Sequence, residues 1–290
     1  MDTSFLSRRL TNRQRRVLKA AYYGLKGRVV RLVASYTPAQ LEAKLRGLGI
    51  APNDAVLMHS AFSQFNGFQG TPGQVIDCVM NVVGPQGHLF MLSLAYTGSA
   101  RDYLTTGKPF DVRRTVSQMG IVTETFRRRE GVLRSANPLH PVLARGPQAE
   151  RIVAGHEELP YSCGPGSPFE KMLELDTKVL FFDVGFEVFG FWHYLEHRFK
   201  DRAPVPLYSP VPLEGTLIDR EGRERKLPLY VFDREAIRRR NYPALKTALL
   251  EAGSLVQARI GNSKLMLVRA ADALRCTEAL YEGGGTLYKE

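Results

Sequence analysis

The chain has 290 residues, of which 44% are hydrophobic and 24% are charged, and this balance excludes a disordered or fibrous protein. No apolar run approaches the roughly 20 residues that a membrane-spanning helix needs, so an integral membrane protein is excluded as well. The net charge of +11 is concentrated in residues 1–36, which hold nine Lys and Arg against one Asp and leave +3 for residues 37–290.

The first predicted element is a basic amphipathic helix within residues 1–36. Leu18, Tyr22 and Leu25 are part of an apolar stripe with spacings of three and four, which intervening glycines weaken. Three roles stay open for this N-terminal arm. It packs on the body or on a second subunit, it binds an anionic membrane surface, or, least favoured, it binds nucleic acid.

Strands and helices alternate from Thr37 onward, and Thr-Pro pairs at residues 37 and 71 predict two helix starts. The predicted helices cover residues 37–48, 71–83, 121–129, 191–200 and 270–281, the predicted strands cover 55–59, 88–94, 179–184 and 264–268, and a hairpin covers 217–231. Residues 95–117 are polar and irregular, which predicts a loop over a site. Without a repeat or a linker, residues 37–290 are expected to form one domain with a central sheet covered on both faces.

The sharpest local motif is His193-Tyr194-Leu195-Glu196-His197, the H-x-x-E-H pattern of inverted zinc peptidases. On a helix, His193 and His197 would share a face and Glu196 would activate water on a zinc ion. A third ligand is not evident in the sequence. The favoured interpretation is therefore a His–Glu pair with His197 incidental and with no metal.

The three cysteines (Cys78, Cys163 and Cys276) are too few and too widely spaced for a disulfide framework or a paired zinc site. This usage indicates a reducing compartment, and the basic N-terminus lacks the apolar core of a secretory signal, so a cytoplasmic protein is expected, peripheral if the arm binds membrane. Cys163 has no evident cationic neighbour to activate its thiol, and no nucleophile-elbow pattern predicts a catalytic serine.

Several segments, taken together and in order, resemble the aminoglycoside 3-N-acetyltransferase family. They are residues 58–63, 85–91, 117–127, 131–135, 164–168 and 179–185, followed by His193 and Glu196. The resemblance covers roughly residues 37–270. It implies a three-layer α/β/α sandwich around a central mixed sheet, unlike the GNAT fold, with acetyl-CoA as co-substrate and the amino group of an amino sugar or related small amine as acceptor.

In this resemblance His193 is the general base and Glu196 orients its imidazole. The residue types agree with the chemistry, because amine acetylation needs a neutral nitrogen and one helical turn brings the two side chains together. The residues expected on the CoA side are His59, Ser60, Ser63, Met119, Gly120, Arg134 and Ser135. For Arg134 a salt bridge on the sandwich surface stays open as an alternative.

Three positions depart from the family pattern: Asn137 replaces a histidine, Pro141 a serine, and Gly190 the threonine three residues before the catalytic histidine. They leave open a catalytically impaired family member that acts as a binding or accessory protein. His140 is a candidate partial substitute. Because aminoglycosides are polycations and the body carries +3, the charge balance favours a neutral or anionic amine as acceptor.

Overall fold

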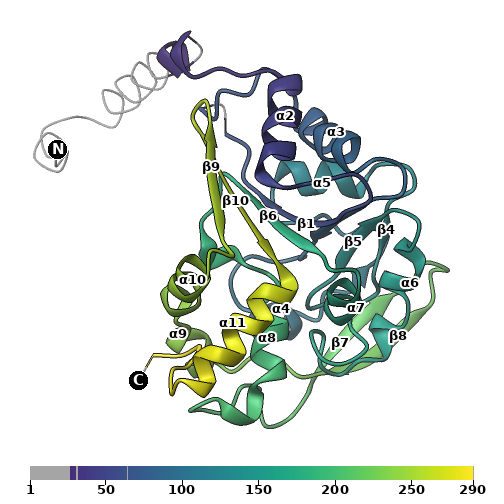
Figure 1. The fold of residues 1–290 in the computed structure, drawn as a ribbon. Helices are drawn as coiled ribbons and strands as arrows, with labels where there is room; N and C mark the ends of the chain where they lie inside the picture. The colour runs from purple at the N-terminus through teal and green to yellow at the C-terminus, as the bar shows by residue number, and fades with distance from the viewer. Residues whose placement is uncertain (1–26, 31, 64, 290) are drawn as a thin grey trace, which may run out of the picture.

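The computed structural model describes residues 27–30, 32–63 and 65–289 (Figure 1). Residues 1–26, the greater part of the predicted N-terminal arm, lie outside the described residues. The role expected of the arm therefore stays a prediction. Within the described part of the chain, no helix combines the length and the apolarity needed to cross a bilayer.

A seven-stranded mixed sheet forms the middle of the fold, in the order β4-β5-β2-β1-β6-β10-β9. Its strands are β1 (Ala55–Ser60), β2 (His88–Leu92), β4 (Leu133–Arg134), β5 (Val142–Arg145), β6 (Lys178–Phe182), β9 (Val256–Ile260) and β10 (Ser263–Arg269). The central strands β2, β1 and β6 run parallel, and the flanking strands pair antiparallel. Every residue of β2 is buried, as expected for a parallel strand covered on both faces.

Three helices cover one face of the sheet: α2 (Pro38–Leu48), α3 (Pro72–Val83) and α5 (Ile121–Arg127) (Figure 1). The helices α2 and α3 begin as the sequence predicts, with a proline in the first turn and capping boxes from Thr37 to Gln40 and from Thr71 to Gln74. Their apolar sides pack on Leu180 and on the other side chains that alternate residues of the strands present to this face.

The opposite face is covered by a larger set of helices. They are α6 (Ala149–Val153), α7 (Pro168–Glu174), α8 (Trp192–Arg198), α9 (Arg234–Arg239), α10 (Tyr242–Glu251) and α11 (Ala270–Glu282), with short 3-10 turns at His156–Glu158, Phe186–Val188 and Lys200–Arg202. Val179 and Phe181 of β6 point into this core, whereas Leu180 and Phe182 point into the other. The predicted α/β/α sandwich is therefore confirmed.

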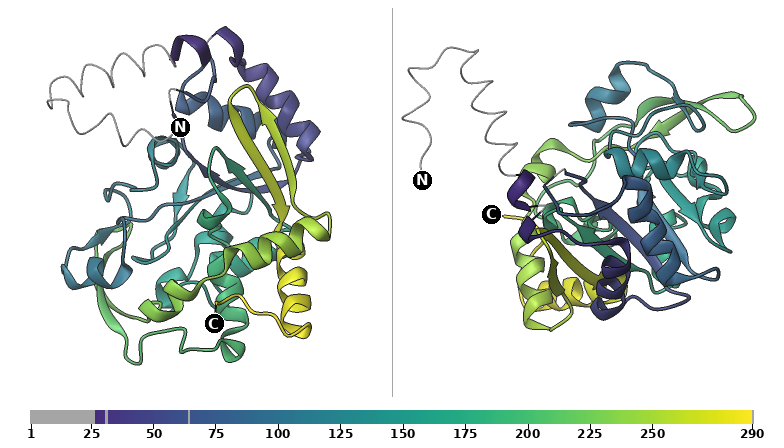
Figure 2. Two further views of the ribbon diagram at one scale, coloured as in Figure 1. Left: turned by 90° about the vertical axis from the view of Figure 1, so that its left-hand side faces the viewer. Right: turned by 90° about the horizontal axis from the view of Figure 1, so that it is seen from above.

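A second sheet of three strands, β3 (Phe110–Asp111), β7 (Leu213–Ile218) and β8 (Glu224–Leu229), lies beside the sandwich and carries α4 (Ala100–Thr105). The β7–β8 hairpin confirms the predicted one and projects from the molecule (Figure 2). The prediction of a wholly irregular segment at 95–117 is wrong. Ser99 caps α4, and Phe110 pairs with Leu217, a long-range contact with no local signal.

Tyr36 shows where the packed body begins. Its ring is buried, its hydroxyl lies 2.6 Å from Ser263 Oγ on β10, and its backbone bonds to Gly67 and Gln69. The boundary predicted between residues 36 and 37 thus falls inside a segment that packs against the body. The β9–β10 hairpin reaches this end of the molecule, where β9 lies beside α2 (Figure 2).

Candidate active site

Three side chains meet around the buried carboxylate of Glu196 on α8. His193 lies one turn before it, with Nδ1 3.3 Å from Glu196 Oε2. Arg240 donates from Nε to Oε1 at 2.8 Å and from Nη2 to Oε2 at 2.7 Å, a bidentate ion pair. The hydroxyl of Tyr288 donates to Oε1 at 3.2 Å. The carboxylate of Glu196 is thereby fixed on both of its oxygens.

The sequence analysis did not find Arg240 and Tyr288. Arg240 follows α9, and Tyr288 lies near the C-terminus. The two residues form an isolated antiparallel bridge that closes the C-terminal segment over α8. Arg240 also lies 5.1 Å from the ring centroid of Phe232. Arg240 is the last of three consecutive arginines, and nothing in the local sequence marks it as the buried one.

Burial and neighbouring charges have opposing effects on the pKa values of His193 and Glu196. Burial lowers the pKa of His193, and the neighbouring Glu196 only partly offsets this effect. Burial alone would raise the pKa of Glu196, but Arg240 and His193 outweigh it, so that pKa lies below its usual value. The result is a charged Glu196–Arg240 pair beside a neutral imidazole. Arg240 Nη2 also lies 3.3 Å from His193 Nδ1. In the tautomer that carries its proton on Nδ1 and donates it to the carboxylate, Nε2 is the ring nitrogen that can accept another proton.

His193 opens onto a cavity of about 330 Å³. One part of its wall comes from the end of β1, with His59 and Ser60, and from the segment before α5, with Met119. The other part comes from residues 184–190 and from α10. The amide of Gly190 donates to His59 Nε2 at 3.1 Å. Burial, and after it the electrostatic influence of the His193 ring, lowers the pKa of His59 to about 3, so His59 stays neutral.

Gly190, the departure nearest to the catalytic pair, is enclosed by two side chains of this wall. A Cβ at this position would lie 2.8 Å from His59 Cε1 and closer still to Leu92 Cδ1. The space of the threonine expected from the resemblance is therefore filled here by Leu92 and His59.

We expect Gly190→Ala to lower the free energy of unfolding by about 1–3 kcal/mol, because Leu92 and His59 must move. In Gly47→Ala the added Cβ meets nothing within 4 Å, so this variant, within helix α2, should be unchanged or more stable. Urea unfolding of the two variants gives the comparison. Equal stability of Gly190→Ala and the wild type would show that the pocket has room for the larger residue.

The structure brings only part of the predicted CoA-side set to this cavity. His59, Ser60 and Met119 line it, and Gly120 follows Met119 as the N-cap of α5. Ser63 is exposed on the loop after β1, where its hydroxyl accepts from the amide of Phe65 at 3.2 Å. Arg134 and Ser135 lie elsewhere, buried in the body of the protein.

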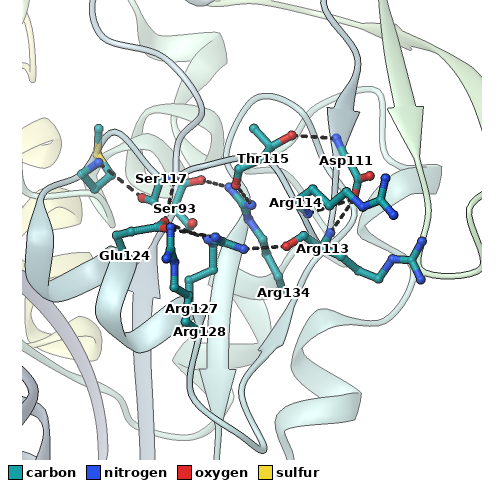
Figure 3. A network of polar contacts seen from close by, with 11 residues as sticks. Ser93, Asp111, Arg113, Arg114, Thr115, Ser117, Glu124, Arg127, Arg128 and Arg134 are labelled. Carbon is teal, nitrogen blue, oxygen red and sulfur yellow. Dashed lines mark hydrogen bonds and ion pairs between the residues drawn. The ribbon is translucent and has the colours of Figure 1, made fainter.

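Arg134 is the centre of a polar network that holds the segment from Asp111 to Met119 in place (Figure 3). Its guanidinium donates to the carbonyls of Thr115 and Ser93 and lies 4.5 Å from the ring centroid of Phe110. Burial lowers the pKa of Arg134 to about 9. These bonds make Arg134 an anchor of the cavity wall, which differs from both the CoA contact and the surface salt bridge considered above.

Glu124 on α5 completes the same network (Figure 3). It accepts from the amide of Ser117 at 2.9 Å and pairs with Arg127 and Arg128 at 2.7 Å. The hydrogen bond from Arg127, the largest influence, lowers the pKa of Glu124 to about 2. The hydroxyl of Ser117 in turn accepts from the amide of Met119 at 3.3 Å. The network therefore fixes Met119, the residue of this segment that lines the cavity.

Asn137 and Pro141 belong to a buried cluster beside His193. The Oδ1 of Asn137 accepts from the amide of Leu139 at 2.9 Å, and the carbonyl of Pro141 accepts from the amide of Ser93 at 2.8 Å. The ring of His140 lies 4.8 Å from that of His193, and its Nδ1 lies 2.7 Å from Ser162 Oγ. His140 therefore packs against His193, and neither Asn137 nor Pro141 is among the residues that line the cavity.

Ser135 joins the same buried cluster through His156. Its hydroxyl accepts from the amide of Val142 at 2.8 Å and lies 2.8 Å from His156 Nδ1. The other ring nitrogen of His156 lies 2.7 Å from the carbonyl of Ser162. The Ser135 hydroxyl and the two ring nitrogens of His156 thus form their polar contacts within the protein interior.

The second histidine of the H-x-x-E-H motif turns away from the first. His197 Nδ1 lies 2.8 Å from the hydroxyl of Tyr208, and its ring packs on Tyr161. Across the described residues, no group of three or more His, Cys, Asp or Glu side chains is placed to hold a metal ion. Burial raises the pKa of the Cys163 thiol, which keeps it protonated.

The α/β/α sandwich places a carboxylate-bonded histidine at the wall of a cavity, an arrangement suited to acid–base chemistry. A model of the aminoglycoside 3-N-acetyltransferase family matches residues 57–282. The chain belongs to this family, and the resemblance found in the sequence is confirmed.

Similar proteins support this assignment. Aminoglycoside N(3)-acetyltransferase IV of Salmonella sp is 32% identical over 182 residues, which span 62% of this chain and 66% of that protein. The apoenzyme of aminoglycoside acetyltransferase AAC(3)-IVa superposes with a TM-score of 0.69 at 27% identity, over 86% of this chain and 90% of the other. AAC-IIIb in its binary complex with CoASH shares the fold, with a TM-score of 0.71 at 24% identity over 89% of this chain and 100% of the other.

Proposed function

We propose that this protein is an acetyl-CoA-dependent N-acetyltransferase that acts on the amino group of an amino sugar or related small amine. The observation that carries the proposal is the His193–Glu196 pair, held at the wall of a cavity in a chain of this family. The names of the relatives, which are aminoglycoside N(3)-acetyltransferases, support an amino sugar as the acceptor class.

His193 is proposed to take the proton that the acceptor nitrogen loses. The acceptor amine attacks a thioester carbonyl, forming the new C–N bond, and the C–S bond breaks to release the thiol. The proton moves from the nitrogen to His193 Nε2 and from there to the leaving sulfur. Glu196 stabilises the imidazolium that forms in between, since its carboxylate faces Nδ1. Acetyl-CoA supplies the activated acetyl group when bound.

The cavity fits the thioester end of acetyl-CoA. Leu92, Leu94 and Met119 give it an apolar wall for an acyl group and a thioether chain. Ser60 Oγ, on the same wall, is buried and has no hydrogen-bond partner among the described residues. A buried hydroxyl of this kind can donate to a carbonyl oxygen of the bound group. His59 and Met119 are proposed to line the same channel, and Gly120 stands next to it.

The proposed place of action is the cytoplasm. The basic charge of residues 1–36 supports a further contact of this segment with an anionic membrane surface or a second subunit.

The direct test measures release of free thiol from acetyl-CoA in the presence of a panel of amines. We expect release that depends on an amino sugar and yields its N-acetyl product, identified by mass spectrometry. Binding of CoA without acetylation of any amine in the panel would instead favour a binding or accessory role for this family member.

A further inference from the structure

We infer that the acceptor of this enzyme carries an anionic group, and that a basic cleft beside the cavity binds it. This inference rests on the proposed function. The basic cleft is a hollow of about 590 Å³ whose charged lining consists of Lys246, Arg259, Lys264 and Glu187.

The basic cleft adjoins the catalytic cavity. Val184 and Glu187 line both. A ligand whose amino group lies near His193 can therefore extend past Glu187 into the basic cleft. The hollow is formed by the segment after β6, by α10 and by the β9–β10 hairpin. Its cations are Lys246 from α10, Arg259 from β9 and Lys264 from β10.

Two of these cations are placed against each other. Arg259 and Lys264 are direct partners in the antiparallel β9–β10 register. Like charges directly opposite on neighbouring strands destabilise a sheet. Neither residue, nor Lys246, forms an ion pair within the described part of the chain. A bound anion would relieve this repulsion.

The nearby carboxylates do not cancel the charge. Glu187 is a single acid against three bases in the lining. Asp183 is also within electrostatic reach of Lys264 and accepts from Ser263 Oγ at 2.7 Å and from the amide of Lys264 at 2.8 Å. Counting both Glu187 and Asp183 as charged, the three bases still outnumber the two acids. An excess of positive charge therefore remains, which suits phosphate or carboxylate and disfavours a polycation.

The place of the basic cleft assigns it to the acceptor. The residues proposed for the thioester side, His59, Ser60 and Met119, line the catalytic cavity but not the basic cleft. The residues shared by the two hollows, Val184 and Glu187, belong to the other part of the wall, formed by residues 184–190. The acetyl donor and the anionic part of the acceptor thus approach His193 from different sides.

The test compares glucosamine 6-phosphate with glucosamine, which differ only in the phosphate. Binding of each to the full chain is measured by calorimetry with CoA present, and steady-state kinetics follow acetyl transfer. The variant is Lys246→Gln/Arg259→Gln/Lys264→Gln. The single variants Lys264→Gln and Lys108→Gln form a matched pair, because both lysines are exposed and Lys108 lies outside both hollows, between α4 and β3.

We expect glucosamine 6-phosphate to bind more tightly than glucosamine, and the triple variant to weaken its binding by roughly 10- to 100-fold. Binding of glucosamine and the KM for acetyl-CoA should stay unchanged, and Lys108→Gln should have no effect. Equal affinity for the two sugars, or an effect of Lys108→Gln as large as that of Lys264→Gln, would overturn the inference.

Two further outcomes separate this inference from the proposed function. If the triple variant instead raises the KM for acetyl-CoA, and 3′-dephospho-acetyl-CoA is insensitive to the substitutions, the basic cleft binds the CoA phosphate and the inference is wrong. If the sugar phosphate binds through the three cations but no amine is acetylated, the basic cleft is an anion site as inferred, whereas the proposed function, and with it the role of the bound sugar phosphate as acceptor, fails.

Discussion

Replacing His193 by alanine is expected to reduce kcat by about 10²- to 10⁴-fold, the usual cost of losing a general base. The KM for acetyl-CoA should change little, because the imidazole acts on the proton of the acceptor nitrogen. His197→Ala is the matched control, since this histidine lies on the same helix but bonds to Tyr208. Turnover of His193→Ala close to that of the wild type would contradict the assignment of the base.

The same imidazole gives a second readout that does not depend on turnover. Since burial lowers the pKa of His193, NMR titration of its ring should give a midpoint below the ordinary 6.5. Glu196→Gln removes the charge that favours the imidazolium, so the midpoint should fall further. Because the unfolded chain protonates near 6.5, this histidine stabilises the fold fully above that pH, and the contribution is lost as the pH falls below it. A midpoint above 6.5 would show that the carboxylate outweighs burial.

The sequence predicts best those elements whose signals are local. Thr37 and Thr71 each begin a helix with a proline and a glutamine at fixed offsets, so their capping boxes can be read directly. The inner strands β1 and β6 are almost continuous apolar runs because helices cover both faces of the sheet. By contrast, β9 has an exposed, polar sequence and exists through its pairing with β10, and the sequence analysis missed it.

The residues of the site also divide into those with a local sequence signal and those that only the fold brings together. His193 and Glu196 are three residues apart, so helical spacing brings them together and the sequence indicates the pair. Arg240 and Tyr288 lie 44 and 92 residues beyond Glu196, and only the folded chain shows that they bind the same carboxylate. Arg134 illustrates the opposite case. Its place in a family motif suggested a CoA contact, whereas the structure engages its guanidinium with the carbonyls of Ser93 and Thr115.

Arg240 is the residue whose replacement should cost the most stability. Its guanidinium is 9% exposed, and the carboxylate of Glu196 is fully buried. Arg240→Met keeps most of the apolar contact with Phe232 but leaves the charge of Glu196 without its partner. Breaking a buried pair from one side costs about 3–5 kcal/mol, because the remaining ion has lost both water and its counter-ion. The buried carboxyl should then take up a proton, and its hydrogen bond would no longer stabilise the His193 imidazolium.

We therefore expect Arg240→Met to lower the free energy of unfolding by that amount and also to reduce kcat, in contrast to Arg238→Met. Arg238 pairs with Glu235 at the exposed surface of α9, where water screens the charges, so its loss should change neither quantity appreciably.

The double variant Glu196→Gln/Arg240→Met separates the effect on stability from the effect on catalysis. It removes both buried charges and should recover much of the lost stability while remaining impaired in catalysis, because His193 still lacks its carboxylate. Urea unfolding and acetyl-transfer rates of the three variants provide the measurement. Recovery of activity together with stability in the double variant would show that Glu196 has no role in positioning the base.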